Sequence, residues 1–316
     1  MSSLAEKYGE QELFNISPFA YKEGLTVKES DENYPNIGKL QDMLLKDKVL
    51  TKRHMYIIQF IYELGFVTQK QIEWAMNGCS IVDPFVKNMA MFKPYDNDVK
   101  TLLNLGVIRK GEVLSGGKKY VRYYRLTPAT EEWFRSCVTF EKESFYSEAY
   151  AVRPSRMLNL APEVILGELA ATDFAIRTVV YSSDRLVKRS RFYLENASFL
   201  FSGRYTFENG MHMLVLPVRR EIDYGKVIDA LKLPNFARPD YKLVVLCDSV
   251  SSRSDGTEPF SEILKKRLRT EGLTNDSALY FADDTSLKNP QRPTIYKIRK
   301  ETTVVYDGFW EEEEAD

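Results

Sequence analysis

Hydrophobic residues recur at helical spacing in the first third of the chain. A short helix is predicted over Ile37 to Leu45, and a stronger pattern follows Thr51 and ends at Gly65. The apolar positions of this second helix share one face: Ile57, Ile58, Ile61 and Leu64. Thr68 and Gln71 then have the spacing of a capping box, which predicts a further helix ending near Asn77-Gly78.

A third amphipathic pattern begins at Asp96, a residue type favoured at helix N-caps, and ends at Gly106. Its two faces differ clearly in polarity. The inward face is predicted to carry Val99, Leu102, Leu103 and Leu105, and the outward face Asn97, Lys100, Thr101 and Asn104. Side chains of the outward set can hydrogen-bond DNA bases or phosphates.

A β-hairpin is predicted after this helix. Val107 to Arg109 and Tyr120 to Leu126 are rich in β-forming residues, and Gly116-Gly117 between them favours a tight turn. Alternation along the second strand predicts that Tyr123 and Tyr124 point to opposite faces, one inward and one outward. Thr127-Pro128 then begins another helix. Three helices, a hairpin and a helix form the order of a winged helix-turn-helix.

The second half of the chain combines helical and strand patterns. The predicted elements are a helix from Pro162, a hairpin of Ser198 to Phe207 and Met211 to Val218, a helix from Asp223 to Leu233, a strand from Leu243 to Cys247, a helix from Pro259 to Leu268, and strands near Leu279 to Phe281 and Thr294 to Ile298. This order favours an α/β domain with a mixed sheet, so the fold class expected for the whole chain is α+β.

Four segments follow from these patterns and from the length of 316 residues. Residues 1–36 are expected to be a flexible arm, and residues 37–150 a winged-helix DNA-binding domain. Residues 151–305 are expected to form the α/β domain, and residues 306–316 an acidic tail.

The 44 basic and 45 acidic residues leave a net charge of −1, so the chain as a whole gives no electrostatic indication of nucleic-acid binding, and only local clusters of charge are informative. Residues 101–125, however, contain six basic side chains against Glu112 alone. We therefore expect the hairpin and the third helix to contact DNA, with protein contact as the alternative use of the same fold. The expected DNA-binding residues are Lys70, Asn97, Lys100, Thr101, Asn104, Arg109, Lys110, Lys118, Lys119, Arg122 and Arg125.

The sequence gives little indication of a disulfide framework, a metal site or a nucleotide-binding site. Three widely spaced cysteines and two histidines favour neither a disulfide framework nor a metal site, and no glycine-rich nucleotide motif occurs. No metal and no cofactor are therefore expected, and Asp283-Asp284 with Asp255 and Glu258 is the weaker magnesium alternative. Without a long apolar run, the expected location is cytoplasmic, with no membrane contact.

Three phrases of the chain resemble the replication-relaxation proteins of plasmids and integrative elements. They are Val67 to Ile72, Leu102 to Ile108 and Tyr123 to Pro128. The resemblance covers about residues 50–250. It implies a DNA-binding winged helix followed by a core similar to that of restriction endonucleases, with Glu168 on the leading helix.

In such a core, the resemblance also implies an acid on the hairpin and a (D/E)xK motif on the next strand. Leu200 to Gly203 contains no acid, and Leu216 to Arg220 contains arginines where the motif is expected. We therefore expect a degenerate, non-catalytic core. A divergent metal-dependent nuclease that uses Glu221 or Asp223 with Lys226 remains the alternative.

The expected function is that of a DNA-binding accessory protein in replication or mobilisation of a plasmid or other mobile element. Its expected partners are double-stranded DNA, a replication or mobilisation protein, and a second copy of the chain, since one winged helix buries little DNA surface. A winged-helix transcriptional regulator is the third possibility.

Overall fold

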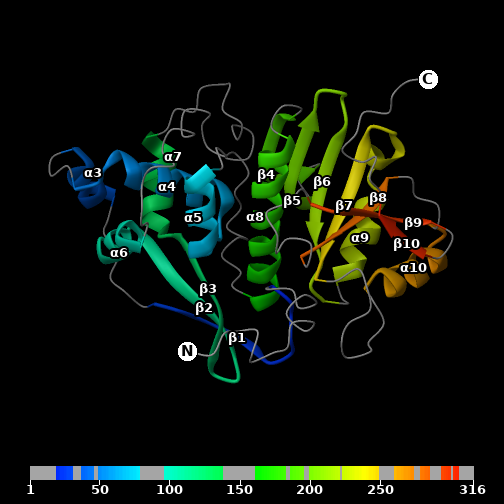
Figure 1. The fold of residues 1–316 in the computed structure, drawn as a ribbon, viewed down its shortest axis with the longest axis horizontal. Coiled ribbons are helices and arrows are strands. Elements are labelled where there is room, and N and C mark those ends of the chain that lie inside the picture. Colours follow the sequence, from blue (N-terminus) through cyan, green and yellow to red (C-terminus); the bar gives the residue numbers. More distant parts are fainter. Residues whose placement is uncertain are drawn as a thin grey trace. The chain divides into compact units, whose positions relative to one another are not determined.

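The chain divides into two compact units, which are described separately. The first comprises Lys22–Val180, and the second combines Met1–Tyr21 with Tyr181–Asp316. The computed structural model describes residues 19–30, 37–45, 49–78, 96–137, 161–182, 186–195, 199–220, 223–248, 260–273, 278–284, 293–299 and 302–305. These residues form eight α-helices and two sheets, one of them mixed, so the predicted α+β class is confirmed (Figure 1).

The helices of the first unit follow the predicted hydrophobic patterns. They are α3 (Ile37–Leu45), α4 (Lys52–Leu64), α5 (Gln69–Gly78), α6 (Asp96–Asn104), α7 (Pro128–Cys137) and α8 (Pro162–Ser182), whose last two residues lie beyond the unit boundary. Ile57, Ile58, Ile61 and Leu64 are fully buried, as their shared face predicts. Residues 79–95, between α5 and α6, lie outside the described part of the chain.

Helix α4 begins with a capping box that the sequence analysis missed. The amide of His54 donates to Oγ1 of Thr51, and the amide of Thr51 donates to Nδ1 of His54, both at 3.2 Å. Because Nδ1 accepts the hydrogen bond from the Thr51 amide, the neutral imidazole carries its hydrogen on Nε2, which lies 3.3 Å from the carboxylate of Asp98 on α6. Arg53 pairs with the same carboxylate at 2.8 Å. These contacts join the start of α4 to α6.

The capping box predicted for α5 is present. The amide of Gln71 donates to Thr68 Oγ1 at 3.2 Å, and the amide of Thr68 donates to Gln71 Oε1 at 2.7 Å. The Nε2 group of Gln71 also reaches α8, where it donates to the carbonyl of Leu169 at 2.9 Å and to Oδ1 of Asp173 at 2.6 Å. A single amide therefore caps α5 and attaches it to α8.

A small antiparallel sheet with the order β1-β2-β3 lies in the same unit. Strands β2 (Ile108–Ser115) and β3 (Lys118–Leu126) form the predicted hairpin, and Gly116 and Gly117 both have positive φ in its turn. Strand β1 (Leu25–Glu29) pairs with β2 along its whole length (Figure 1). The sequence predicts a flexible arm here, and this expectation is wrong for residues 25–29, because pairing with β2 supplies the backbone partners that local sequence lacks.

The two adjacent tyrosines of β3 are both buried, contrary to the simple alternation. Tyr123 is 0% and Tyr124 is 3% exposed. Their side chains leave the strand on opposite sides, and each side is covered. Phe66 contacts the ring of Tyr123, and a short bridge in which Val67 and Tyr124 exchange backbone hydrogen bonds of 3.1 and 2.7 Å fixes the other edge of β3. The β2–β3 hairpin therefore lies between β1 at one edge and Val67 of the α4–α5 connection at the other.

The second unit contains a mixed sheet whose strands follow one another in space as they do in sequence. Its order is β10-β9-β8-β7-β6-β5-β4, in which β6, β7 and β8 are parallel and the other pairs are antiparallel. The strands are β4 (Leu186–Glu195), β5 (Phe199–Phe207), β6 (His212–Pro217), β7 (Tyr241–Cys247), β8 (Leu279–Asp283), β9 (Ile295–Arg299) and β10 (Thr302–Val305). The edge strands β4 and β10 were not predicted.

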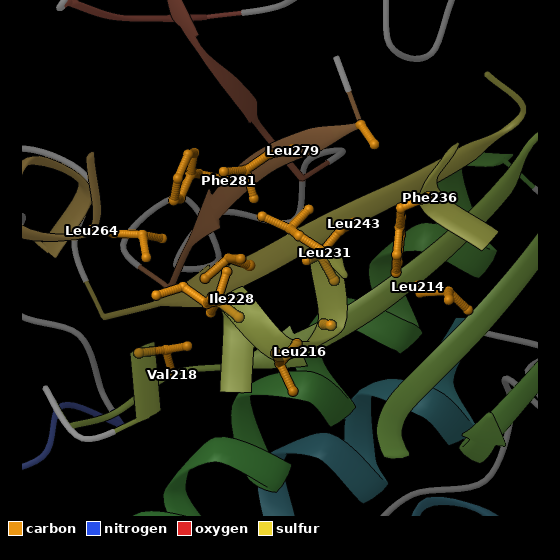
Figure 2. Packing of buried hydrophobic residues seen from close by; sticks show 14 of the residues in the cluster. Leu214, Leu216, Val218, Ile228, Leu231, Phe236, Leu243, Leu264, Leu279 and Phe281 are labelled. Atoms are coloured by element: carbon orange, nitrogen blue, oxygen red, sulfur yellow. The ribbon is translucent and has the colours of Figure 1, made fainter. Parts of the chain in front are cut away.

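Helices α9 (Tyr224–Leu231) and α10 (Phe260–Thr270) connect the parallel strands and share one apolar core with them. Figure 2 shows Ile228 and Leu231 of α9 gathered with Leu243 of β7, and Leu264 of α10 beside them. Both crossovers agree with the predicted helices. Burial of this cluster against the sheet stabilises the unit.

The boundary between the units falls later than the sequence predicts. The division lies between Val180 and Tyr181, so almost all of α8 belongs to the first unit and not to the α/β half that was expected to begin at residue 151. Gln71 and Thr172 explain this, since both hydrogen-bond between α8 and the α4–α5 region. No helix among the described residues is long and apolar enough to cross a membrane. Residues 306–316, the expected acidic tail, lie outside the described ranges.

Asp173 should make the stability of the first unit depend on pH. Burial raises the pKa of Asp173 to about 6, against the hydrogen bond from Gln71 and the charge of Arg177. A raised pKa favours folding at low pH, and this contribution is lost as pH rises through 6. Asp173→Asn, which cannot ionise, should therefore gain stability over the wild type between pH 4 and 8, by at most about 3 kcal/mol at ~1.4 kcal/mol per pKa unit.

Urea unfolding of the full chain at several pH values measures this difference. Asp229→Asn, at an exposed aspartate of α9, is the control for the loss of one carboxylate. A constant difference between Asp173→Asn and the wild type from pH 4 to 8 would contradict the assignment.

Candidate nucleic-acid interface

Helix α6 presents a polar surface to solvent. Asn97, Lys100 and Asn104 are exposed, while Val99 and Leu102 are 2% and 0% exposed on the opposite face. Thr101 is half-buried, and its hydroxyl donates to the carbonyl of Asn97 at 2.8 Å. Three of the four predicted contact residues of this helix therefore present side chains to solvent, and the hydroxyl of Thr101 already serves its own backbone.

The hairpin carries its most accessible positive charge at the tip. Lys118 and Lys119 follow the Gly116-Gly117 turn and are exposed, and among the described residues neither forms an ion pair. Lys110, in the middle of β2, is half-buried. Lys70 is exposed in the first turn of α5. The ammonium groups of the three exposed lysines are accessible to an anionic ligand.

Arg122 is accessible but shares its charge with Glu112 directly opposite on β2. Nε and Nη2 of Arg122 donate to Oε1 of Glu112 at 3.0 and 2.8 Å, and the arginine side chain is 43% exposed. The hydrogen bond from Arg122 holds the pKa of Glu112 below its usual value. An exposed pair of this kind is weak, so a phosphate can compete for Arg122.

Arg109 and Arg125 both form ion pairs with an acidic side chain that was not identified from the sequence. Glu29, the last residue of β1, accepts from Nη1 of Arg109 at 2.9 Å and, bidentately, from Nε and Nη2 of Arg125 at 2.8 and 2.6 Å. The hydroxyl of Tyr123 donates to the same carboxylate at 2.9 Å. The three partners come from β2 and β3, so one carboxylate joins all three strands.

Gly111 makes this convergence possible. It lies in register between Glu29 of β1 and Tyr123 of β3, and the Tyr123 side chain crosses β2 above it. A Cβ atom at residue 111 would overlap the phenol ring. The glycine is therefore needed for space, and the phenol reaches across the central strand to the carboxylate.

The electrostatics of the cluster keep Glu29 charged and Tyr123 neutral. Burial alone would raise the pKa of Glu29, but hydrogen bonds from Arg125, Arg109 and Tyr123 outweigh it and hold that pKa below its usual value. Burial, together with the neighbouring carboxylate, raises the pKa of Tyr123 far above that of a free phenol. The Glu29 charge is thus fully present near neutral pH.

The predicted contact residues consequently fall into two groups. Lys70, Asn97, Lys100, Asn104, Lys110, Lys118, Lys119 and Arg122 keep solvent-accessible side chains, whereas Thr101, Arg109 and Arg125 are engaged within the unit. The sequence contained one signal that Glu29 would matter: an acid at the end of a β-branched, alternating stretch. Its partners, 80 residues away or more, were not predictable from it.

In the second unit, acidic side chains gather where the parallel strands end. Arg219 follows β6 and pairs with Asp284 through Nη2, at 3.0 and 2.9 Å from the two carboxylate oxygens, with both side chains almost fully buried. Asp223 accepts from the amides of Arg219 and Arg220 and, at 2.7 Å, from Lys226. Protein donors therefore already engage both acids.

Cys247 ends β7 beside this group. Its thiol donates to the carbonyl of Ala282 at 3.4 Å, and burial, followed by the charges of Asp283 and Asp248, raises its pKa well above the usual value. The described ranges contain no group of three or more histidine, cysteine or acidic side chains suited to a metal ion. Asp255, Glu258 and Glu221, named in the metal and nuclease alternatives, lie outside those ranges.

Comparison of the chain with protein-family models, with curated proteins and with solved structures finds no match. The function is therefore proposed from the geometry of the two units together with the sequence resemblance described above.

Gly111→Ala should destabilise the first unit. The added methyl group overlaps the Tyr123 ring, which is fully buried and cannot move aside without breaking its hydrogen bond to Glu29. Overpacking of this kind costs about 1–3 kcal/mol. Thermal unfolding measures the loss, and Gly225→Ala is the control because a Cβ there meets no atom within 4 Å. Equal melting temperatures for Gly111→Ala and the wild type would contradict the packing described for Tyr123.

Proposed function

We propose that the protein binds double-stranded DNA through a winged helix formed by α4, α5, α6 and the β2–β3 hairpin. In this assignment α6 is the recognition helix, the hairpin is the wing, and Val67 is the short strand that joins the first and second helices to the wing sheet. The order of elements and the backbone pairing of Val67 with Tyr124 support it.

The observation that carries the proposal is the solvent-exposed chemistry of two adjoining elements. Asn97, Lys100 and Asn104 on α6 provide amide and ammonium groups, and the hairpin that follows presents Lys118 and Lys119 at its tip. Asparagine suits the bidentate pattern of adenine in the major groove, and lysine suits phosphate. This division assigns base reading to α6 and backbone contact to the wing.

For the second unit we propose a scaffold related to the restriction-endonuclease core, without cleavage activity. The β4–β5–β6 meander followed by a parallel β7 supports this topology. Arg219, buried against Asp284, follows the strand on which the resemblance implies a (D/E)xK motif. Because Asp223 is held by two backbone amides and Lys226, we assign it a structural role and not that of a metal ligand.

Within the replication-relaxation resemblance, this architecture corresponds to an accessory protein of a plasmid or other mobile element. The DNA-binding unit would locate the complex, and the second unit would provide the contact with a replication or mobilisation protein. We expect a homodimer on DNA, since two winged helices double the number of bases read.

Replacing the wing lysines should weaken DNA binding and reduce its salt dependence. Each phosphate contact contributes about 0.9 to the slope of log K against log salt. Lys118→Ala/Lys119→Ala should therefore reduce the slope by about 1.8 and lower the affinity for a random duplex. Fluorescence anisotropy over a salt series measures both quantities.

Lys232→Ala, at the exposed lysine that directly follows α9, is the matched control and should leave the slope unchanged. Absence of binding by the wild type at low salt would refute DNA binding and leave protein contact as the alternative use of this unit. The same mixtures, incubated with magnesium and analysed on a gel, test the nuclease alternative, for which nicked DNA is the positive result.

A further inference from the structure

The three groups that surround Glu29 have the composition of an oxyanion site. Two guanidinium groups and one phenol hydroxyl converge on one carboxylate, and Arg125 donates to both of its oxygens. Arginine forks of this kind bind carboxylate and phosphate in the same bidentate geometry. The ligand that now fills the site belongs to the chain itself.

The site is only partly enclosed. The side chains of Glu29, Arg125 and Arg109 are 9%, 11% and 18% exposed, so its cationic rim touches solvent. The two arginines of the site are positioned by strand pairing that does not involve β1. Arg109 and Arg125 lie opposite each other on β2 and β3, whose pairing continues from Ile108 to Ser115 without any contribution from β1.

Of the three strands that contribute to the site, β1 is the one that can detach without disrupting the pairing of the other two. It has five residues, stands at the edge of the sheet and pairs with β2 alone. Its departure would leave the β2–β3 hairpin intact and would remove the Glu29 carboxylate from between Arg109 and Arg125. Directly opposed like charges on neighbouring strands are unfavourable, so the vacated site would favour another anion.

We propose that Arg109, Tyr123 and Arg125 form a phosphate-binding site that Glu29 of β1 occupies in cis and thereby withholds from DNA. This inference rests on the proposed DNA-binding function of the same unit. The ligand chemistry is a singly charged oxyanion, and the source to which we assign it is the DNA backbone. Strand β1 then limits the number of phosphates that the wing sheet contacts.

The first experiment tests the site without DNA. Glu29→Ala should lower the melting temperature at low ionic strength, and millimolar inorganic phosphate should restore it by more than the same phosphate raises that of the wild type. Chloride at equal ionic strength separates screening from binding. Glu29→Ala/Arg125→Ala, which lacks the bidentate partner, should lose the phosphate effect.

The second experiment measures DNA binding by Glu29→Gln, which keeps the size of the side chain and removes its charge. Release of one or two arginines should steepen the salt slope by about 0.9 to 1.8 and raise the affinity at low salt. Glu23→Gln is the matched control, because Glu23 is an exposed acid two residues before β1 and its substitution changes the net charge equally. Its slope should equal that of the wild type.

The outcomes separate the two proposals. If the wild type binds DNA and Glu29→Gln has the same slope as Glu23→Gln, the phosphate site is refuted and DNA binding stands. If phosphate does not stabilise Glu29→Ala more than the double variant, the site is likewise refuted. If the wild type and every variant fail to bind DNA while Glu29→Ala responds to phosphate, the oxyanion site stands and its assignment to DNA is overturned.

Discussion

The first unit depends on the contacts that compensate two arginines lying opposite each other in its sheet. Arg109 and Arg125 face one another across β2 and β3, where like charges repel, and the Glu29 carboxylate resolves this by accepting from both. The carboxylate can reach them only because β1 pairs with β2, and Tyr123 can join them only because Gly111 has no side chain. Removing one partner of such a cluster leaves an uncompensated charge in a half-buried position, which is costly.

This cluster also shapes the surface proposed to meet DNA. Residues 101–125 contain six basic side chains, but the accessible positive charge of the hairpin lies mainly on the lysines near its tip. Arg122 is also accessible, but it is paired with Glu112. The same chemistry recurs in the second unit, where Arg219 and Asp284 pair at the end of the parallel strands. In both units, arginine serves first to hold strands and loops together, so a count of basic residues overstates the charge available to a partner.

Local features were the predictable ones. The helices from α3 to α10, the hairpin turn at Gly116-Gly117 and the Thr68–Gln71 capping box depend on side-chain spacing within a few residues, and each was predicted. Strands β1, β4 and β10 were missed, because an edge strand acquires its conformation from a neighbour and not from its own sequence. The burial of both tyrosines of β3 was missed for the same reason, since Phe66 packs against the ring of Tyr123 and Val67 pairs with the backbone of Tyr124.

The sequence by itself determined the α+β class, the polar face of α6 and the lysine-bearing turn, since periodicity and turn chemistry are properties of adjacent residues. Only the tertiary structure decided which basic residues remain accessible. Glu29 and Arg109 are separated by 80 residues along the chain, and their distance of 2.9 Å is produced by the β1–β2 pairing. The sequence shows how many charged side chains there are. Which of them are neutralised depends on the segments that fold against one another, because ion pairs act over a few ångströms.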